Sequence, residues 1–340
     1  MPSATMPERT GYIFNGYFFR TSGVGTQYYS STGQSMRTWN VAADSRLYAY
    51  WTAKECPLKF NANGGTGTMP SGKRATYDQP MPAYDQSAPT RTGYRFNGYY
   101  DTSSTSGGKQ YYTNGLASAN TWDKDTTSET TLYARWLVNQ YTATFVHNDG
   151  TGNTTQKTQD YGTELTAPTL TRPGYTLASW NPAVDSTMQA ENKTYTAQWT
   201  ANTYTVTFDK QDGTGGTDST TVTYGQAMPT ITPPTRTRYI FEGYYDGTNG
   251  TGTQYYLADG TSARTCDLTE ATPLYAAWSV VAAYDLRIAR MPAYAGTATG
   301  SGTHCAGDTF TITATATDPR YVFNVWSVDD PSLVADKYSA

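Results

Sequence analysis

The chain has 340 residues and a net charge of −4, and only 15% of its residues are charged. This charge leaves no basic surface to hold the phosphates of a nucleic acid or the head groups of an anionic membrane. No run of about 18 apolar residues is present, so we expect no membrane insertion in this segment. The 30 tyrosines and 31 glycines favour strands and turns over helices, and they predict a mostly β protein with little helix.

A tyrosine-rich motif recurs along the chain. In residues 93–100, large side chains such as Tyr94 and Phe96 occupy every second position, which is the period of a strand with one buried face. Gly98 follows two positions later, where the lack of a side chain lets a neighbouring backbone or ring come close. Versions of this tyrosine strand occupy residues 11–18, 93–100, 174–180, 239–245 and 321–326. Five copies of one strand indicate five copies of one small module.

Two other strands accompany the tyrosine strand. A closing strand follows it at residues 47–51, 132–136, 195–199 and 274–278. In the first copy, Leu47, Ala49 and Trp51 alternate onto one face, so we expect the tryptophan to seal a small core. An opening strand, such as the one that ends at Phe60, precedes the tyrosine strand and runs directly into a Gly-rich turn. A strand, a Gly-rich turn and a second strand predict a β-hairpin.

These motifs predict five segments. They are a partial module (1–51), three modules (52–136, 137–199 and 200–278) and a divergent, truncated module (279–340). The first lacks an opening hairpin, and the last has a predicted strand at 309–316 and a tyrosine strand but no closing strand. Residues 1–9 also lack the pattern of a signal peptide. We therefore expect the sequence to be a fragment or processed product of a longer secreted protein.

A peripheral segment with a Gln-Tyr-Tyr motif is present in three modules and absent from the short module 137–199. Its tyrosines are Tyr28, Tyr29, Tyr111, Tyr112, Tyr255 and Tyr256. Neighbours in a strand point to opposite faces, so one ring of each pair packs on its own module while the other is exposed or meets a neighbour. Two alternatives stay open: packing between the hairpin and the core, or an aromatic surface that binds glycan or protein.

The three cysteines do not have the paired spacing of a metal site. Cys56 and Cys266 stand where other modules carry tyrosine or tryptophan, which fits buried free thiols. Cys266 and Cys305 lie in adjacent segments and are a candidate disulfide in an oxidising compartment, with free thiols as the alternative. At least one thiol stays unpaired within the monomer.

Residues suited to catalysis are scarce. His147 and His304 lie in non-equivalent places, and Cys305 follows His304 directly, so the two side chains of that pair point to opposite faces of a strand. Three aspartates, at 209, 212 and 218, crowd one Gly-rich turn. A solvated hairpin turn is favoured there over calcium, which needs six to eight oxygen ligands. We expect no catalytic residue, metal site, cofactor or enzymatic activity.

Together, the motifs resemble the Listeria–Bacteroides repeat, the B-repeat of internalin-type bacterial surface proteins. Residues 60–65, 93–100 and 132–136 carry the resemblance, which covers positions 1–278, and the last segment resembles a divergent B-repeat. One departure is that Tyr17, Tyr99 and Tyr244 stand where the family has tryptophan. The resemblance implies tandem β-grasp-like modules that form an elongated rod on a secreted or wall-anchored bacterial protein.

The function implied is that of a non-catalytic, extracellular surface or adhesin-type repeat protein that acts as a structural stalk. The first and last segments carry complementary parts of a repeat, and two explanations stay open: a head-to-tail filament in which one subunit completes the next by adding strands, or ends that reflect only where the fragment was cut. The alternative is a module that recognises host glycan or protein through its Tyr-rich hairpins. The expected partners are therefore further copies of the chain, or a host or cell-surface protein or glycan, and no nucleic acid.

Overall fold

The structure, a computed structural model, describes residues 1–326. Its regular elements are strands and two 3-10 turns, η1 (Thr21–Gly23) and η2 (Thr248–Gly250), and these residues contain no α-helix. The prediction of mostly β modules with little helix is confirmed. No helical segment of this part is long and apolar enough to cross a membrane. The chain divides into two compact units, residues 1–169 with 179–197 and residues 170–178 with 198 onward.

The first unit begins with a three-stranded antiparallel sheet. Its strands, in spatial order, are β2 (Gln27–Tyr29), β1 (Tyr12–Phe18) and β3 (Tyr48–Ala53). Strand β1 is the tyrosine strand of this segment, and β3 is its closing strand. Strand β3 pairs with β1 along one edge, and its other edge has no partner strand among the described residues.

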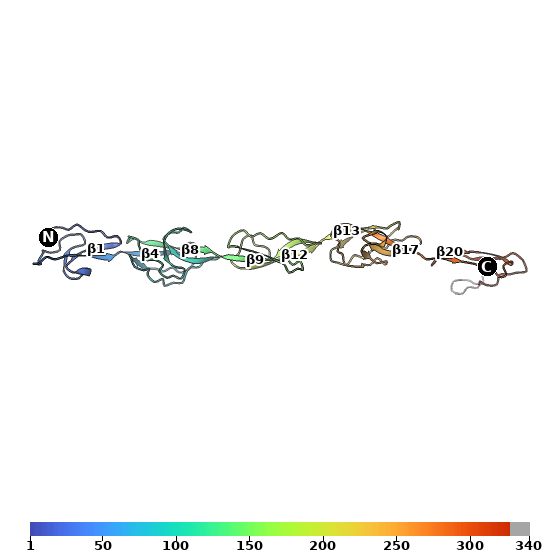
Figure 1. Ribbon diagram of the computed structural model, residues 1–340, viewed down its shortest axis with the longest axis horizontal. Helices are drawn as coiled ribbons and strands as arrows, with labels where there is room; N and C mark the ends of the chain where they lie inside the picture. Colours follow the sequence, from blue (N-terminus) through green and yellow to red (C-terminus); the bar gives the residue numbers. More distant parts are fainter. Residues whose placement is uncertain (327–340) are drawn as a thin grey trace. The chain divides into compact units, whose positions relative to one another are not determined.

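The next sheet of this unit has five strands. In spatial order they are β5 (Arg74–Thr76), β4 (Glu55–Asn61), β8 (Thr130–Val138), β6 (Tyr94–Tyr100) and β7 (Gln110–Tyr112). The opening strand β4 and the closing strand β8 run parallel and lie side by side (Figure 1), with Phe60 opposite Leu132. Alternate residues of β8, namely Leu132, Ala134 and Trp136, are buried. The two-residue period of the closing motif therefore corresponds to one buried face of a strand.

The short module forms a four-stranded sheet. Its strands, in spatial order, are β10 (Thr154–Asp160), β9 (Gln140–Val146), β12 (Lys193–Ala201) and β11 (Tyr175–Asn181). Here too the opening strand β9 and the closing strand β12 are parallel, with Phe145 opposite Tyr195. The boundary between the two compact units falls within β11 and β12.

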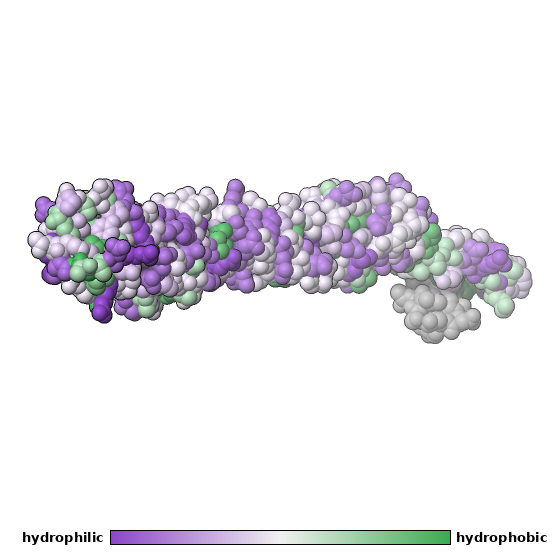
Figure 2. Space-filling view, turned by 60° about the vertical axis from the view of Figure 1, so that its left-hand side comes forward, coloured by the Kyte–Doolittle hydropathy of each residue, from purple (hydrophilic) through white to green (hydrophobic). Residues whose placement is uncertain are grey.

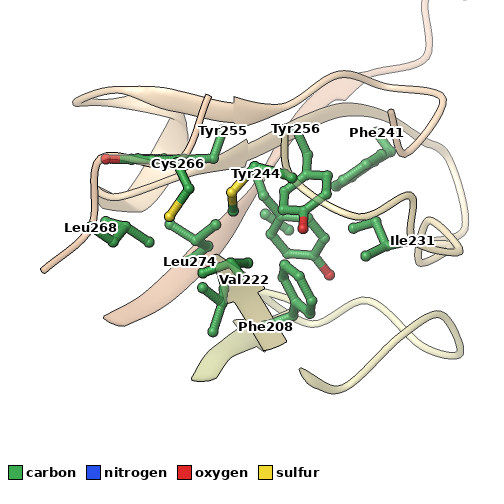
Figure 3. Close-up of a cluster of buried hydrophobic side chains, with 13 residues drawn as sticks. Phe208, Val222, Ile231, Phe241, Tyr244, Tyr255, Tyr256, Cys266, Leu268 and Leu274 are labelled. Carbon is green, nitrogen blue, oxygen red and sulfur yellow. The ribbon is translucent and has the colours of Figure 1, made fainter. Parts of the chain in front are cut away.

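The second unit repeats the five-stranded arrangement. The spatial order is β14 (Ser219–Thr223), β13 (Thr203–Asp209), β17 (Thr272–Val280), β15 (Tyr239–Tyr245) and β16 (Gln254–Tyr256). Figure 3 shows its core, in which Phe208 lies against the rings of Tyr244 and Tyr256 at centroid distances of 4.5 and 5.4 Å. Leu274 and Tyr256 are completely buried. Burial of such side chains contributes about 1.5–3 kcal/mol each to folding.

The last segment of the second unit forms two antiparallel strand pairs. They are β18 (Ala283–Leu286) with β20 (Gly302–Cys305), and β19 (Gly296–Thr299) with β21 (Thr313–Ala316). The strand predicted over 309–316 begins only at Thr313, and the tyrosine strand predicted at 321–326 is not a strand in the structure. Elsewhere this motif pairs with a closing strand, and residues 279–326 supply none. The β-grasp-like character implied by the resemblance stays a prediction.

Candidate functional site

The structure places the tyrosines of the Gln-Tyr-Tyr motif inside the modules. Tyr111 and Tyr112 on β7 are 0% and 1% exposed, and Tyr255 and Tyr256 on β16 are 4% and 0% exposed. In the first sheet, Tyr28 is buried as well, and Tyr29 is partly buried. Both sides of the peripheral strand are covered, so the alternation of side chains does not leave one ring exposed. Of the two alternatives, the structure favours packing, because buried rings offer no face to a glycan or protein.

The first tyrosine of each pair braces the loop that follows the peripheral strand. The ring of Tyr111 packs on Trp122, with centroids 4.9 Å apart, and its hydroxyl donates a hydrogen bond of 2.5 Å to Asp123. Tyr28 donates in the same way to Asn40, and Tyr255 donates to Asp267 at 2.8 Å. Burial, followed by the bond to Asp123, raises the pKa of Tyr111 above its ordinary value. Its hydroxyl therefore stays protonated and continues to donate.

The glutamine and second tyrosine of the motif hold the peripheral strand on the tyrosine strand. The Gln110 side-chain amide donates to the carbonyls of Asn97 and Tyr112, at 3.0 and 3.1 Å. Gly98 has a φ of +108°, and a Cβ there would collide with the Tyr112 carbonyl oxygen. The register of the tyrosine strand shifts at this point, as in a β-bulge. The Gln-Tyr-Tyr motif is thus a structural clamp on the tyrosine strand.

The candidate disulfide is not formed. Cys266 and Cys305 are both free thiols, so this prediction is corrected. Cys266 is 2% exposed inside the core of the 200–278 module, next to Leu274 and Tyr256 (Figure 3). Cys305 instead lies on β20, where it pairs with Ala283. Cys266 lies in the connection between β16 and β17, whereas Cys305 lies on β20, and adjacency of the two segments in sequence did not determine where each thiol points.

The acidic turn of the second unit is held by ion pairs. Asp212 pairs with Arg236 at 3.2 Å, and Asp218 pairs with Lys210 at 2.5 Å. Asp209 accepts the backbone N–H of Gln211 at 3.0 Å. Among residues 1–326, no group of three histidine, cysteine or acidic side chains is arranged to hold a metal ion. The contacts given for these aspartates therefore lie within the turn and its immediate neighbours.

The histidines have structural partners. The His147 ring nitrogen lies 2.8 Å from the Thr155 hydroxyl. The ring of His304 is stacked on Phe310, with centroids 3.7 Å apart, and its Nε2 lies 3.1 Å from the Gly300 carbonyl oxygen. Each ring therefore contacts residues close to it in the chain.

A contact that the sequence analysis did not single out recurs where one module meets the next. A single residue, Asn139, connects the closing strand β8 to the opening strand β9. Its N–H donates to the Gly93 carbonyl at 2.9 Å, and its own carbonyl accepts the N–H of Tyr161 at 2.9 Å. Gly93 begins the tyrosine strand of one module, and Tyr161 follows β10 of the next. Asn139 thus ties both modules through its backbone.

Side chains complete this junction. The Tyr161 ring lies against Gly93 and meets Tyr94 edge to face, with centroids 5.9 Å apart at 80°. The Arg91 guanidinium lies over the Tyr94 ring, 4.1 Å from its centroid. Gly93 has a φ of +77°, and a Cβ at this residue would collide with the Tyr161 ring. Only glycine accommodates both the backbone conformation and the ring. We call this arrangement of arginine, glycine, two tyrosines and a connecting residue the junction latch.

The junction latch occurs twice more with the same parts. The members of the first are Arg9, Gly11, Tyr12, Lys54 and Tyr77. The members of the second are Arg172, Gly174, Tyr175, Asn202 and Tyr224. The tyrosine centroids are 5.7 and 5.4 Å apart, and both guanidinium groups lie 3.8 Å from the ring below. A sequence signal for it exists: an arginine stands three residues before the first tyrosine of the strand in each case.

The junction before the last segment differs. Two residues, Val281 and Ala282, connect β17 to β18. The Val281 N–H donates to the carbonyl of Arg238, which stands in place of the glycine, and the Ala282 carbonyl accepts the N–H of Ala306. Ala306 occupies the place of the second tyrosine and has no ring to pack. The backbone part of the latch is present here, and Arg236 lies 4.0 Å from the centroid of the Tyr239 ring, but the second tyrosine ring is missing.

A surface cavity of about 520 Å³ lies beside the latch at Asn139. Its lining residues are Arg95, Val138, Asn139, Gln140, Tyr141 and Asp160. The Gln140 amide donates to Asp160 across this space at 3.0 Å.

The fold and the junctions define a class of protein: tandem modules of mixed β-sheet, joined end to end through a repeated backbone and ring contact. A sequence model of the Listeria-Bacteroides repeat domain matches residues 58–135, 141–202 and 204–276, which make up more than half of the chain. The chain belongs to the Listeria-Bacteroides repeat family.

Three other bacterial proteins are similar to this chain in sequence. A putative Gly-rich membrane protein of Evansella cellulosilytica is 26% identical over 80% of this chain and 31% of its own length. A putative membrane protein of the same organism is 24% identical, over 81% of this chain and 40% of that protein. Internalin H of Listeria monocytogenes is 34% identical over 36% of this chain and 23% of its own length. The chain spans less than half the length of each of these relatives.

Proposed function

We propose that this protein is a non-catalytic structural repeat protein of the bacterial cell surface, whose tandem modules act as a stalk. The observation that carries the proposal is the junction latch, because the same contacts join consecutive modules at three places. Repeats that contact only their neighbours let a chain gain length without a new fold for each addition. The charged and aromatic side chains described above are used in bracing, clamping and pairing.

The extracellular location rests on the relatives. Internalin H and two putative membrane proteins are similar to this chain in sequence, and the resemblance is to internalin-type surface proteins. The visible face of the molecule in Figure 2 is a mixture of hydrophilic residues and residues of intermediate hydropathy, with apolar residues in small separate groups. Such a surface fits a spacer that stays in water. Protease treatment of intact source cells tests the location: loss of the protein without lysis supports it, and full protection contradicts it.

A second candidate is assembly by strand complementation. It is favoured by one observation: among residues 1–326, the closing strand β3 and the opening strand β18 each have an edge without a partner strand. Recognition of a host glycan or protein by the Tyr-rich hairpins receives less support, because five of the six rings are buried.

The stalk proposal is tested by measuring whether a latch restricts the motion of the modules that it joins. Spin labels are attached at Lys59→Cys and Gln156→Cys, two exposed positions on either side of Asn139, in a Cys305→Ser background. We expect pulsed electron resonance to give a narrow distance distribution for the wild-type junction. Since a Cβ at Gly93 collides with Tyr161, Gly93→Ala should broaden it.

Gly162→Ala is the matched control. Gly162 has a φ of +80°, close to that of Gly93, and no atom lies within 4 Å of a Cβ built there. The substitution carries the same backbone cost, about 1 kcal/mol, without the collision. We expect it to leave the distance distribution unchanged. A broad distribution in the wild type would show that the junction does not act as a fixed connection.

A further inference from the structure

The opening and closing strands of each complete module are neighbours in the interior of its sheet. Strand β4 lies between β5 and β8, and β8 lies between β4 and β6. The pairs β9 with β12 and β13 with β17 are placed in the same way. Single residues, Lys54, Asn139 and Asn202, precede the three opening strands. Tension along the chain therefore enters a module through its opening strand and leaves through its closing strand. We call these two strands the terminal pair of the module.

The two strands of a terminal pair run in the same direction. In the first pair, Leu58 lies opposite Thr130 and Asn61 lies opposite Tyr133. Tension pulls β4 toward its amino end and β8 toward its carboxyl end, and these ends lie at opposite ends of a parallel pair. The strands must then slide along each other before they separate. Because hydrogen bonds between parallel strands are evenly spaced along the pair, sliding strains them together and not one after another.

The terminal pairs are alike in length and are shielded from water. Leu58 and Phe60 on β4 are 5% and 6% exposed, and Leu132 on β8 is completely buried. The neighbouring strands also cover both outer edges of the pair. A hydrogen bond in such surroundings is electrostatically stronger than one in water. The paired residues are 58–61 with 130–133, 143–146 with 193–196, and 206–209 with 272–275.

The rest of each module lies off the path of the force. While the terminal pair holds, tension passes directly from β4 to β8, and residues 62–129 between them carry none of it. The peripheral strands β7 and β16 belong to this bypassed part. The short module has four strands and no peripheral strand, yet its terminal pair has the same parallel overlap. Among the three complete modules, the terminal pair is thus the part that stays the same.

We propose that the complete modules resist stretching, and that the terminal pair of each is the element that gives way under force; this inference rests on the structural role proposed above. A stalk transmits tension between its two ends. Because connections of one residue join the terminal pairs in series, each pair carries the whole of that tension. The repeat would then serve as a tether that holds its length under force, which a passive spacer need not do.

Pulling one module in two directions with optical tweezers tests this inference on the full chain. The handles are attached to engineered thiols in a Cys305→Ser background, in which the remaining cysteines, Cys56 and Cys266, are buried. Glu55→Cys with Leu137→Cys places the handles at opposite ends of β4 and β8. Both residues are exposed. This geometry makes the two strands slide along each other.

Glu55→Cys with Glu129→Cys is the matched control. Glu129 is exposed and immediately precedes β8, so both handles lie at the same end of the terminal pair and the bonds open one after another. The two variants share the fold and one handle, so a difference in force reports the direction of pulling. We expect the first geometry to need roughly twofold or more the unfolding force of the control, since the bonds resist together. Equal forces would overturn the inference.

The 200–278 module gives an independent comparison, which also covers the loss of the Glu55 ion pair with Arg74. Thr203→Cys with Val280→Cys loads opposite ends of β13 and β17, and Thr203→Cys with Ala271→Cys loads the same end. All three positions are exposed. We expect the same order of unfolding forces. A higher force in the same-end geometry would overturn the inference.

Stretching the wild-type chain from its two ends tests the series arrangement. We expect one sudden lengthening for each complete module, and the smallest from the short module, because it has the fewest residues between its opening and closing strands. Gradual lengthening without such steps would overturn the inference. The distance distribution across Asn139 separates this result from the stalk proposal: a narrow distribution in a chain that lengthens gradually would support a spacer that does not resist force.

Discussion

Two adjacent tyrosines on β16 differ in what their hydroxyl groups meet. Tyr255 donates a hydrogen bond to Asp267 at 2.8 Å. The Tyr256 hydroxyl is buried with no hydrogen-bond partner among the described residues, and Figure 3 shows the two rings pointing in different directions. A buried polar group without a partner costs about 1–3 kcal/mol, whereas a satisfied hydrogen bond contributes about 1 kcal/mol.

Removal of these two hydroxyls should therefore have opposite effects. We expect Tyr256→Phe to leave the free energy of unfolding of the 200–278 module unchanged or raise it by about 1 kcal/mol, and Tyr255→Phe to lower it by a similar amount. Hydrogen exchange of the β17 amides in urea measures this module within the whole chain. A loss of stability in Tyr256→Phe equal to that in Tyr255→Phe would show that the Tyr256 hydroxyl has a partner.

The same tyrosine makes the module sensitive to alkali. Burial, followed by the nearby Cys266, raises the pKa of Tyr256 to about 12. The pKa of a tyrosine in an unfolded chain is about 10. The stability that this raised pKa represents is complete below about pH 10 and is lost as the pH rises through about 12. We expect alkaline unfolding of the module in this window, and Tyr256→Phe should shift its midpoint upward. Tyr284→Phe, at a ring that is 66% exposed, should leave the midpoint unchanged.

At the scale of the element, one closing strand is found in two environments. Leu274 on β17 is completely buried between the opening and tyrosine strands, while the equivalent Leu47 precedes β3 and is partly buried. We expect Leu274→Ala to cost about 2–5 kcal/mol of the stability of its module. Leu47→Ala should cost well under half of that, because it removes fewer contacts. Hydrogen exchange of the two sheets in one sample makes the comparison, and equal costs would mean that the edge of β3 is covered in solution.

The strands themselves could be predicted from local pattern. The alternation of Tyr94 and Phe96 predicted a strand, and β6 is that strand. The parallel pairing of β4 with β8 could not be predicted, because Phe60 and Leu132 are far apart in sequence and a two-residue period does not specify a partner. The burial of both Tyr111 and Tyr112 was missed for a related reason. Alternation assigns the rings to opposite faces, but only the tertiary fold shows that Trp122 covers the second face.

The junction latch shows where sequence information was present but incomplete. An arginine three residues before each tyrosine strand, such as Arg91 before Tyr94, can be read from the sequence. Its meaning depends on Tyr161, which belongs to the next module and packs on Gly93. An arginine such as Arg91 and a tyrosine such as Tyr161 are both common in turns. Their shared role therefore becomes visible only when the chain is folded.

At the scale of the whole molecule, the junctions should differ in their resistance to local opening. The Lys54 N–H donates to Gly11 at 2.8 Å, its carbonyl accepts the N–H of Tyr77 at 2.9 Å, and its ammonium pairs with Asp125. Beyond the last junction, Arg287 and Arg290 are exposed, and this junction has Ala306 in place of the second tyrosine ring of the latch. Protease cleavage of a folded protein follows the free energy of local opening, which is smallest where few contacts hold the backbone.

Limited trypsin digestion should therefore cut the wild-type chain at Arg287 or Arg290 before it cuts at Lys54, as followed by mass spectrometry over time. In Gly11→Ala, the added Cβ would collide with the Tyr77 ring. This substitution should accelerate cleavage at Lys54 and leave the rate at Arg287 unchanged. The two sites serve as controls for each other, since both are read in one digest. First cleavage at Lys54 in the wild type would mean that the latch does not hold the junction. Slow cleavage at Lys54 would show that packing of the Tyr77 ring on Gly11 protects this junction from local opening, as expected of a surface stalk.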